Sequence, residues 1–135
     1  AIRSAFSHTP SMEAHADSAE KHAATAKENE TACREHSAAA AAASTVEETE
    51  QAAVKAETAH ANAKAAAEAA AADLKPLEEA HKAAPEDEAL KALFLRARQA
   101  TAAAEASTLW GGFEADSARA WVKKRSEEGA AAPSS

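Results

Sequence analysis

The sequence predicts an all-α protein: an elongated antiparallel bundle or hairpin of three to four helices, held along an alanine-rich, coiled-coil-like seam. Ala supplies 45 of the 135 residues, and it is the strongest intrinsic helix former because its methyl group loses no rotamer freedom. Apolar positions recur at alternating steps of three and four, the spacing of a helix–helix seam. Ile, Leu, Val, Met, Phe and Trp together supply only 16 residues, so we expect no thick hydrophobic core.

Charge and composition exclude several classes of partner. The formal net charge is −7 at pH 7, and residues 12–73 carry the imbalance with twelve acids against five bases. An acidic surface repels phosphate backbones, so we expect no nucleic-acid partner. No apolar run approaches the roughly 20 residues that cross a bilayer, so we expect no membrane span. Cys33 is the only cysteine, which rules out an internal disulfide.

The first part of the chain is expected to form an arm and then a long helical hairpin. Residues 1–11 predict an N-terminal arm that Pro10 ends, and Ser11 is placed to cap a helix that begins near Met12. The hairpin is expected to cover residues 12–75. The apolar seam of its first helix consists of Met12, Ala16, Ala19, Ala23, Ala26, Glu30, Cys33, Ser37 and Ala40.

The seam then changes register, and two structures fit the change. Either the chain turns back at residues 42–45, where Ser44 and Glu47 match a capping box, or one helix continues with a stutter. No Gly or Pro marks a turn. However, a single helix of about 60 residues would be about 90 Å long with an almost bare Ala stripe, so we favour the hairpin. The second register consists of Val46, Thr49, Ala53, Ala56, His60, Ala63, Ala67, Ala70, Leu74 and Leu77.

Residues 76–128 are expected to form a C-terminal helical region with most of the bulky apolar side chains. Eleven of the sixteen lie between Leu74 and Val122. Pro76 and Pro85 bracket a short segment, and Pro85 followed by three acids predicts a helix start. The inward face of this helix is expected to carry Leu90, Phe94, Ala97, Thr101, Ala104 and Thr108.

The end of the chain is expected to contain one more helix. Gly111 and Gly112 are expected to stop the preceding helix, because paired glycines favour a helix C-terminus. A short helix from Phe113 to about Glu128 then follows. Residues 129–135 are expected to be a disordered tail.

No group of residues predicts catalysis or metal binding. Histidine recurs at positions 8, 15, 22 and 36, but residues seven apart lie about 10.5 Å apart on a helix and cannot share one metal ion. Cys33 and His36 supply only two of the four ligands of a zinc site. Glu57 could pair with His60, but His60 falls in the predicted seam. Without a phosphate-binding loop or a nucleophile motif, we expect no catalytic residue, metal, cofactor or small-molecule substrate, and hence no enzyme.

The aromatic residues are the best candidates for a partner-binding surface. Large rings in a chain so poor in bulky side chains either close the core or anchor a partner. We therefore predict a non-enzymatic structural or accessory subunit that braces or docks onto a larger protein assembly through helix–helix packing and a C-terminal aromatic anchor. Its partners would be other protein subunits. The candidate partner-binding residues are Trp110, Phe113, Trp121, Val122, Leu93, Phe94, Ile2 and Phe6.

An alternative is an extracellular or cell-surface alanine-rich helical binding or coat protein, a class that the chain resembles in composition only. The absence of paired cysteines counts against this class. The chain begins with Ala rather than Met, which removal of an organelle presequence, cleavage of a signal peptide or other trimming would explain. Of these we favour import into an organelle such as a mitochondrion or plastid.

Overall fold

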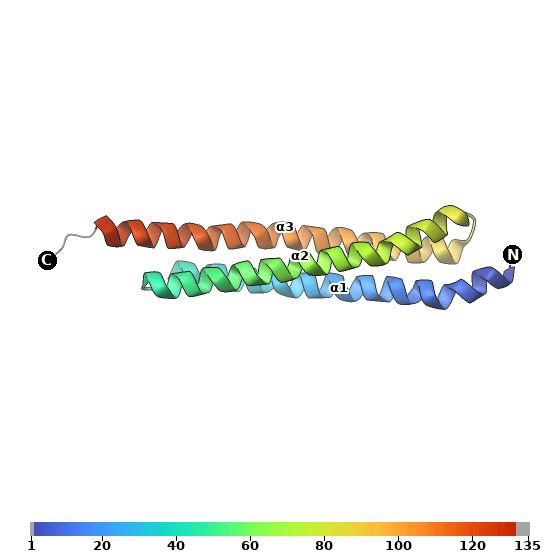
Figure 1. Ribbon diagram of the computed structural model, residues 1–135, viewed down its shortest axis with the longest axis horizontal. Helices are drawn as coiled ribbons and strands as arrows, with labels where there is room; N and C mark the ends of the chain where they lie inside the picture. The colour runs from blue at the N-terminus through green and yellow to red at the C-terminus, as the bar shows by residue number, and fades with distance from the viewer. Residues whose placement is uncertain (1, 132–135) are drawn as a thin grey trace.

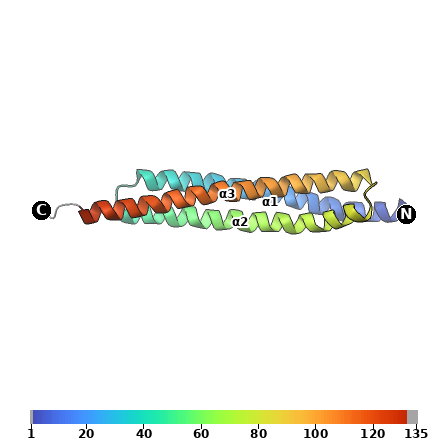
Figure 2. The same ribbon diagram turned by 90° about the horizontal axis from the view of Figure 1, so that it is seen from above.

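The computed structural model consists of three long helices that run up, down and up along one axis (Figures 1 and 2). It describes the backbone of residues 2–131 and the side chains of residues 10–129. The helices are α1 (Ile2–Ala42), α2 (Val46–Ala83) and α3 (Glu88–Ala131), and each contacts both others. This described part of the chain contains no strand. The predicted all-α elongated bundle is therefore confirmed, with three helices.

The hairpin between the first two helices is present. α1 ends at Ala42 and α2 begins at Val46, so the register change marks a turn and not a stutter. Thr45 caps α2: its backbone is extended (φ −121°, ψ 157°), and its hydroxyl accepts a hydrogen bond of 3.1 Å from the Glu48 amide. The Glu48 carboxylate in turn accepts from the Ser44 amide at 3.4 Å. The capping side chains are therefore Thr45 and Glu48, each one residue after Ser44 and Glu47, the pair expected from the sequence.

The start of α1 differs from the expectation of a separate arm. α1 already begins at Ile2 and passes through Pro10, so residues 2–11 belong to the helix and Ser11 is not its cap. A proline within a helix removes one backbone hydrogen bond and bends the helix, but it does not always end it.

α2 likewise continues through Pro76 instead of breaking there. It extends to Ala83, and Leu77 immediately after the proline is fully buried. Full burial of a Leu side chain stabilises by roughly 1.5–3 kcal/mol, which offsets much of the roughly 3 kcal/mol that proline costs inside a helix.

α3 is one continuous helix where the sequence predicts two. Its N-cap is Asp87, whose carboxylate accepts a hydrogen bond of 3.1 Å from the Leu90 amide, so the helix begins after Pro85 and not at it. Its last residues, 129–131, are helical and not a disordered tail. The rest of the predicted tail, 132–135, lies outside the described residues.

The two glycines expected to stop α3 lie inside it because they face the other helices. Neither has a positive φ. A Cβ atom on Gly111 would lie 3.3 Å from the sulfur of Cys33, and one on Gly112 would lie 3.0 Å from Nε2 of His60. The missing side chains therefore allow a thiol and an imidazole to pack against the α3 backbone, and tertiary packing outweighs the low helix propensity of glycine.

The core is made mainly of methyl groups. The predicted seams are largely confirmed, although Val46 is 40% exposed. One buried cluster joins α1, α2 and α3 near the α2–α3 turn, and a second lies near the α1–α2 turn. The largest fully buried side chains are only Leu77, Thr49 and Cys33. The seam positions of α1 that are buried are Ala16, Ala19, Ala26, Glu30, Cys33, Ser37 and Ala40.

Candidate functional site

Three large apolar side chains of α3 lie in solvent. Leu109 is 59% exposed, Trp110 58% and Phe113 55%, and we call this group the aromatic ridge. The Trp110 and Phe113 rings touch, with centroids 5.7 Å apart and planes inclined by 57°. Exposed apolar groups of this size that adjoin one another mark interaction sites more often than isolated exposed residues do.

The ridge is exposed because α3 meets the other two helices through small residues at this level. Ser107, Gly111 and Ala115 form its buried face here. Helical periodicity then directs the neighbouring large side chains away from the bundle axis. The chain has only 16 large apolar residues, and the three of the ridge are the most exposed of the six that, among the described residues, the core leaves at the surface.

The other residues predicted to bind a partner lie in or against the core. Leu93 is only 8% exposed. Phe94 is half-buried and stacks on His81, with ring centroids 5.1 Å apart. Trp121 and Val122 are half-buried and pack against the cluster near the α1–α2 turn.

The structure thus brings together Trp110 and Phe113 of the predicted set and adds Leu109. The side chains of Ile2 and Phe6 lie outside the described residues. A signal for Leu109 exists in the sequence: Ala102, Ala106, Leu109 and Phe113 are spaced by four, three and four, which makes a second apolar stripe offset from the core seam.

Two hollows flank the aromatic ridge. On the α1 side, a hollow of about 540 Å³ is lined by Trp110, Ala103 and the charged residues Lys27, Glu30 and Arg34. Glu30 is 4% exposed, and Arg34 donates to its carboxylate at 2.8 Å. On the α2 side, a hollow of about 360 Å³ is lined by Leu109, Gly112, Phe113, His60, Lys64, Thr108 and Asp116. The ridge therefore stands between two helix–helix grooves.

Cys33 lies beneath this region and has the properties of a packed thiol. Burial, followed by the nearby carboxylates of Glu114 and Glu30, raises the pKa of Cys33. Its sulfur donates a hydrogen bond of 3.4 Å to the carbonyl oxygen of Ala56 on α2. A reactive cysteine needs a lowered pKa and a positive environment, and this site provides the opposite.

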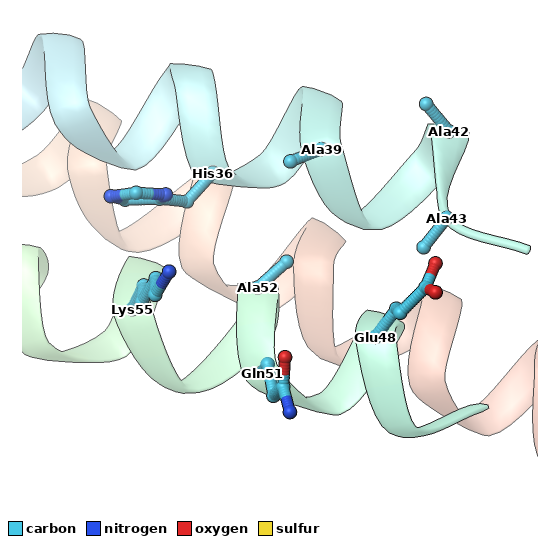
Figure 3. Close-up of a pocket in the computed structure, with 8 residues that line it drawn as sticks. All are labelled: His36, Ala39, Ala42, Ala43, Glu48, Gln51, Ala52 and Lys55. Carbon is cyan, nitrogen blue, oxygen red and sulfur yellow. The ribbon is translucent and has the colours of Figure 1, made fainter. Parts of the chain in front are cut away.

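A third groove lies between α1 and α2 near their turn (Figure 3). It has a volume of about 390 Å³ and an alanine floor that includes Ala39 and Ala52. Figure 3 shows His36 and Lys55 near one end and Glu48 near the other. Glu48 already accepts a hydrogen bond from the turn backbone, so its carboxylate helps to hold the hairpin.

Two of the regularly spaced histidines join α1 to α2. His15 Nδ1 lies 2.9 Å from one oxygen of Asp73, and His22 Nε2 lies 3.7 Å from the other. One half-buried carboxylate thus links two positions that are two helical turns apart. Among the described residues, no group of three or more His, Cys, Asp and Glu side chains has an arrangement that could hold a metal ion.

Comparisons with protein-family models, with curated proteins and with solved structures found no match to this chain. In the part that the structure describes, no helix has both the length and the apolar character required to cross a membrane.

Proposed function

We propose that this protein is a non-enzymatic structural or accessory subunit that docks onto a larger protein assembly through helix–helix packing at the aromatic ridge. The observation that carries the proposal is the exposure of Leu109, Trp110 and Phe113, each more than half accessible. Large aromatic side chains supply most of the binding energy in many protein interfaces because they bury a large area in few rotamers.

The shape of the molecule supports a bracing role. At 1.5 Å per residue, the 44 residues of α3 form a rod of about 66 Å. The aromatic ridge lies near the middle of this rod, so both ends of the bundle extend well beyond the contact. A stiff rod held at its middle can span neighbouring subunits.

The lining of the hollows also supports a role without catalysis. Enzyme pockets combine apolar walls with a few converging polar groups. Alanine lines the hollow on the α1 side, and the exposed side chains of Lys27 and Lys64 border the two hollows. Such surfaces suit the close approach of another helix.

The test compares the wild-type protein with a Trp110→Ala, Phe113→Ala double variant in cells of its natural source. We expect the wild type to sediment with a large complex and the double variant to sediment as free protein, while circular dichroism shows the same helix content for both. Val54→Ala is the matched control, because Val54 is 48% exposed on α2 and outside the ridge.

Free wild-type protein in those cells, or a double variant that still sediments with the complex, would contradict the proposal. Labelling of free protein at the outer cell surface would instead support the alternative of a cell-surface binding or coat protein.

A further inference from the structure

The outer face of α3 carries a second seam in addition to the one that faces the core. Its eight positions alternate in steps of four and three, as in a helix–helix interface, and all are exposed. Six of them are apolar, and the largest, Leu109 and Phe113, also belong to the aromatic ridge. The positions are Leu95, Gln99, Ala102, Ala106, Leu109, Phe113, Asp116 and Ala120.

This seam borders a groove between α2 and α3 that is long enough for several helical turns. The hollow of about 360 Å³ beside Phe113 adjoins a second one of about 270 Å³, since Lys64 and Thr108 line both. Ala67 and Ala71 of α2 form the opposite wall of the second hollow. Leu109 and Phe113 of α3 are the apolar side chains of the first hollow, and Ala67 and Ala71 of α2 are those of the second. A helix that lies along both hollows therefore meets apolar surface from each of the two helices.

The rim of the groove is acidic. Three carboxylates line it, those of Glu68, Glu105 and Asp116. The basic side chains that line it are Lys64 and the half-buried His60. No ion pair among the described residues uses any of these three carboxylates. They are therefore available to a partner of opposite charge.

The same charges disfavour a second copy of this chain as the occupant. A second copy would bring another formal charge of −7 and the same acidic rim to the contact. Like charges placed opposite each other weaken binding and slow association, whereas complementary charges favour both.

We propose that the α2/α3 groove binds a basic amphipathic helix of a partner protein, which lies along α3 as a fourth helix of the bundle. This inference rests on the proposed docking function and names the partner's binding element. The partner helix places leucine-type side chains against Phe113 in the first hollow and against Ala67 and Ala71 in the second. Its flanking lysines or arginines approach Glu68, Glu105 and Asp116.

The experiment uses three labelled synthetic peptides of about four heptads each. The first has a Leu seam flanked by Lys. The second has the same seam flanked by Glu, and the third keeps the Lys residues but carries Ser in the seam. Fluorescence anisotropy measures their binding to the full chain, and Trp110 emission in a Trp121→Phe variant reports burial of the ridge.

We expect saturable binding of the Leu–Lys peptide with a blue shift of Trp110 emission, and binding at least tenfold weaker for the two other peptides. Phe113→Ala should weaken the Leu–Lys peptide at least tenfold. Glu105→Lys combined with Asp116→Lys should do the same. Val54→Ala and Glu35→Lys, at exposed positions outside the groove, should leave the affinity within twofold, and thermal unfolding checks that every variant folds.

Absence of saturable binding, or equal binding of the three peptides, would overturn the inference. So would a loss of affinity with Glu35→Lys as large as that with the rim variants. A dimer in sedimentation equilibrium that Phe113→Ala dissociates would show that a second copy of the chain occupies the groove instead. If the Leu–Lys peptide fails while the ridge double variant still leaves its native complex, the basic helix is wrong and the docking function stands. If the ridge variant also stays in the complex, both are wrong.

Discussion

At the scale of single residues, Gly112 of α3 marks the closest approach between helices. A Cβ atom there would lie 3.0 Å from Nε2 of His60, whereas a Cβ on Gly129 would meet nothing within 4 Å. Gly→Ala inside a helix gains up to about 1 kcal/mol from propensity alone. At Gly112 the new methyl group must first displace an imidazole ring that is half-buried.

We therefore expect Gly112→Ala to destabilise the protein by about 1 kcal/mol, while Gly129→Ala is neutral or slightly stabilising. In a His60→Ala background the same Gly112→Ala change should become stabilising, because the obstacle is gone. Urea unfolding monitored by circular dichroism measures the wild type and the four variants. A Gly112→Ala variant as stable as Gly129→Ala in the wild-type background would show that the ring does not restrict α3.

Glu57 makes the stability depend on pH in the acid range. Its hydrogen bonds with Arg119 are the main cause that lowers the pKa of its carboxyl below the ordinary value of 4.5. A lowered pKa in the folded state means that the ion pair stabilises at pH values above about 4.5 and that this contribution is lost as the pH falls through the lowered value.

We expect the free energy of unfolding of the wild type to fall more steeply below pH 4.5 than that of Glu57→Gln. Because the Glu57 side chain is 46% exposed, solvent screening keeps the difference below about 1 kcal/mol. Urea titrations between neutral pH and pH 2 measure it. Parallel acid profiles of the two proteins would mean that the Arg119–Glu57 pair adds nothing to stability.

At the scale of elements, the start of α2 depends on one hydroxyl group. Thr45 Oγ1 accepts from the Glu48 amide, whereas Ser44 takes part in the turn through its backbone amide. Thr45→Ala should therefore cost about 1 kcal/mol and Ser44→Ala much less, as measured by thermal or urea unfolding. The capping box expected from the sequence makes the opposite prediction, so equal effects or a larger loss at Ser44 would contradict the cap seen here.

The helices could be predicted from the sequence because their seams are local patterns. Steps of three and four identified the buried faces of α1 and α2, and the change of register at Val46 identified the turn without a Gly or Pro to mark it. Both signals follow from helical periodicity, which any sequence displays directly.

Apart from the turn between α1 and α2, the helix ends could not be predicted, because tertiary contacts decide them. Gly111 and Gly112 favour a helix end when considered alone, but Cys33 and His60 from two other helices occupy the space that side chains would take. Pro76 similarly stays within α2 beside the buried Leu77. Cys33 and His60 are both far in sequence from the glycines that they contact, so no local pattern of α3 reports them.

The candidate site was predictable only in part for the same reason. Trp110 and Phe113 could be identified as rare aromatic residues, but periodicity did not show which aromatic side chains α3 would bury. That depended on the uninterrupted course of α3 past its glycines, which rotates Leu109 and Phe113 outward and Ala115 inward.

At the scale of the whole molecule, two arginines of α3 hold the three helices in place. Arg96 pairs with Asp17 and Glu20 of α1, and Arg119 lies 2.6 Å from Glu50 and 2.5 Å from Glu57 of α2. The pairs lie toward opposite ends of α3. Alanine seams alone give little preference for one register over another, whereas each arginine fits only where its two carboxylates lie.

The core has little space for a side chain larger than alanine. Ala53 is fully buried in the cluster near the α1–α2 turn, together with the methyl groups of Ala40, Ala56 and Ala118. The helices approach closely because the buried residues of this cluster are all alanines. Ala53→Leu should therefore push them apart and destabilise the protein by about 1–3 kcal/mol, although a larger apolar side chain would otherwise favour burial.

Ala61→Leu is the matched control, because Ala61 is exposed on the same helix and Leu has nearly the helix propensity of Ala. Urea unfolding should show a loss for Ala53→Leu and almost no change for Ala61→Leu. If Ala53→Leu instead stabilises the protein, the bundle contains spare volume that the alanine seam does not fill. The close approach of the helices would then not explain why the large side chains of α3 remain at the surface.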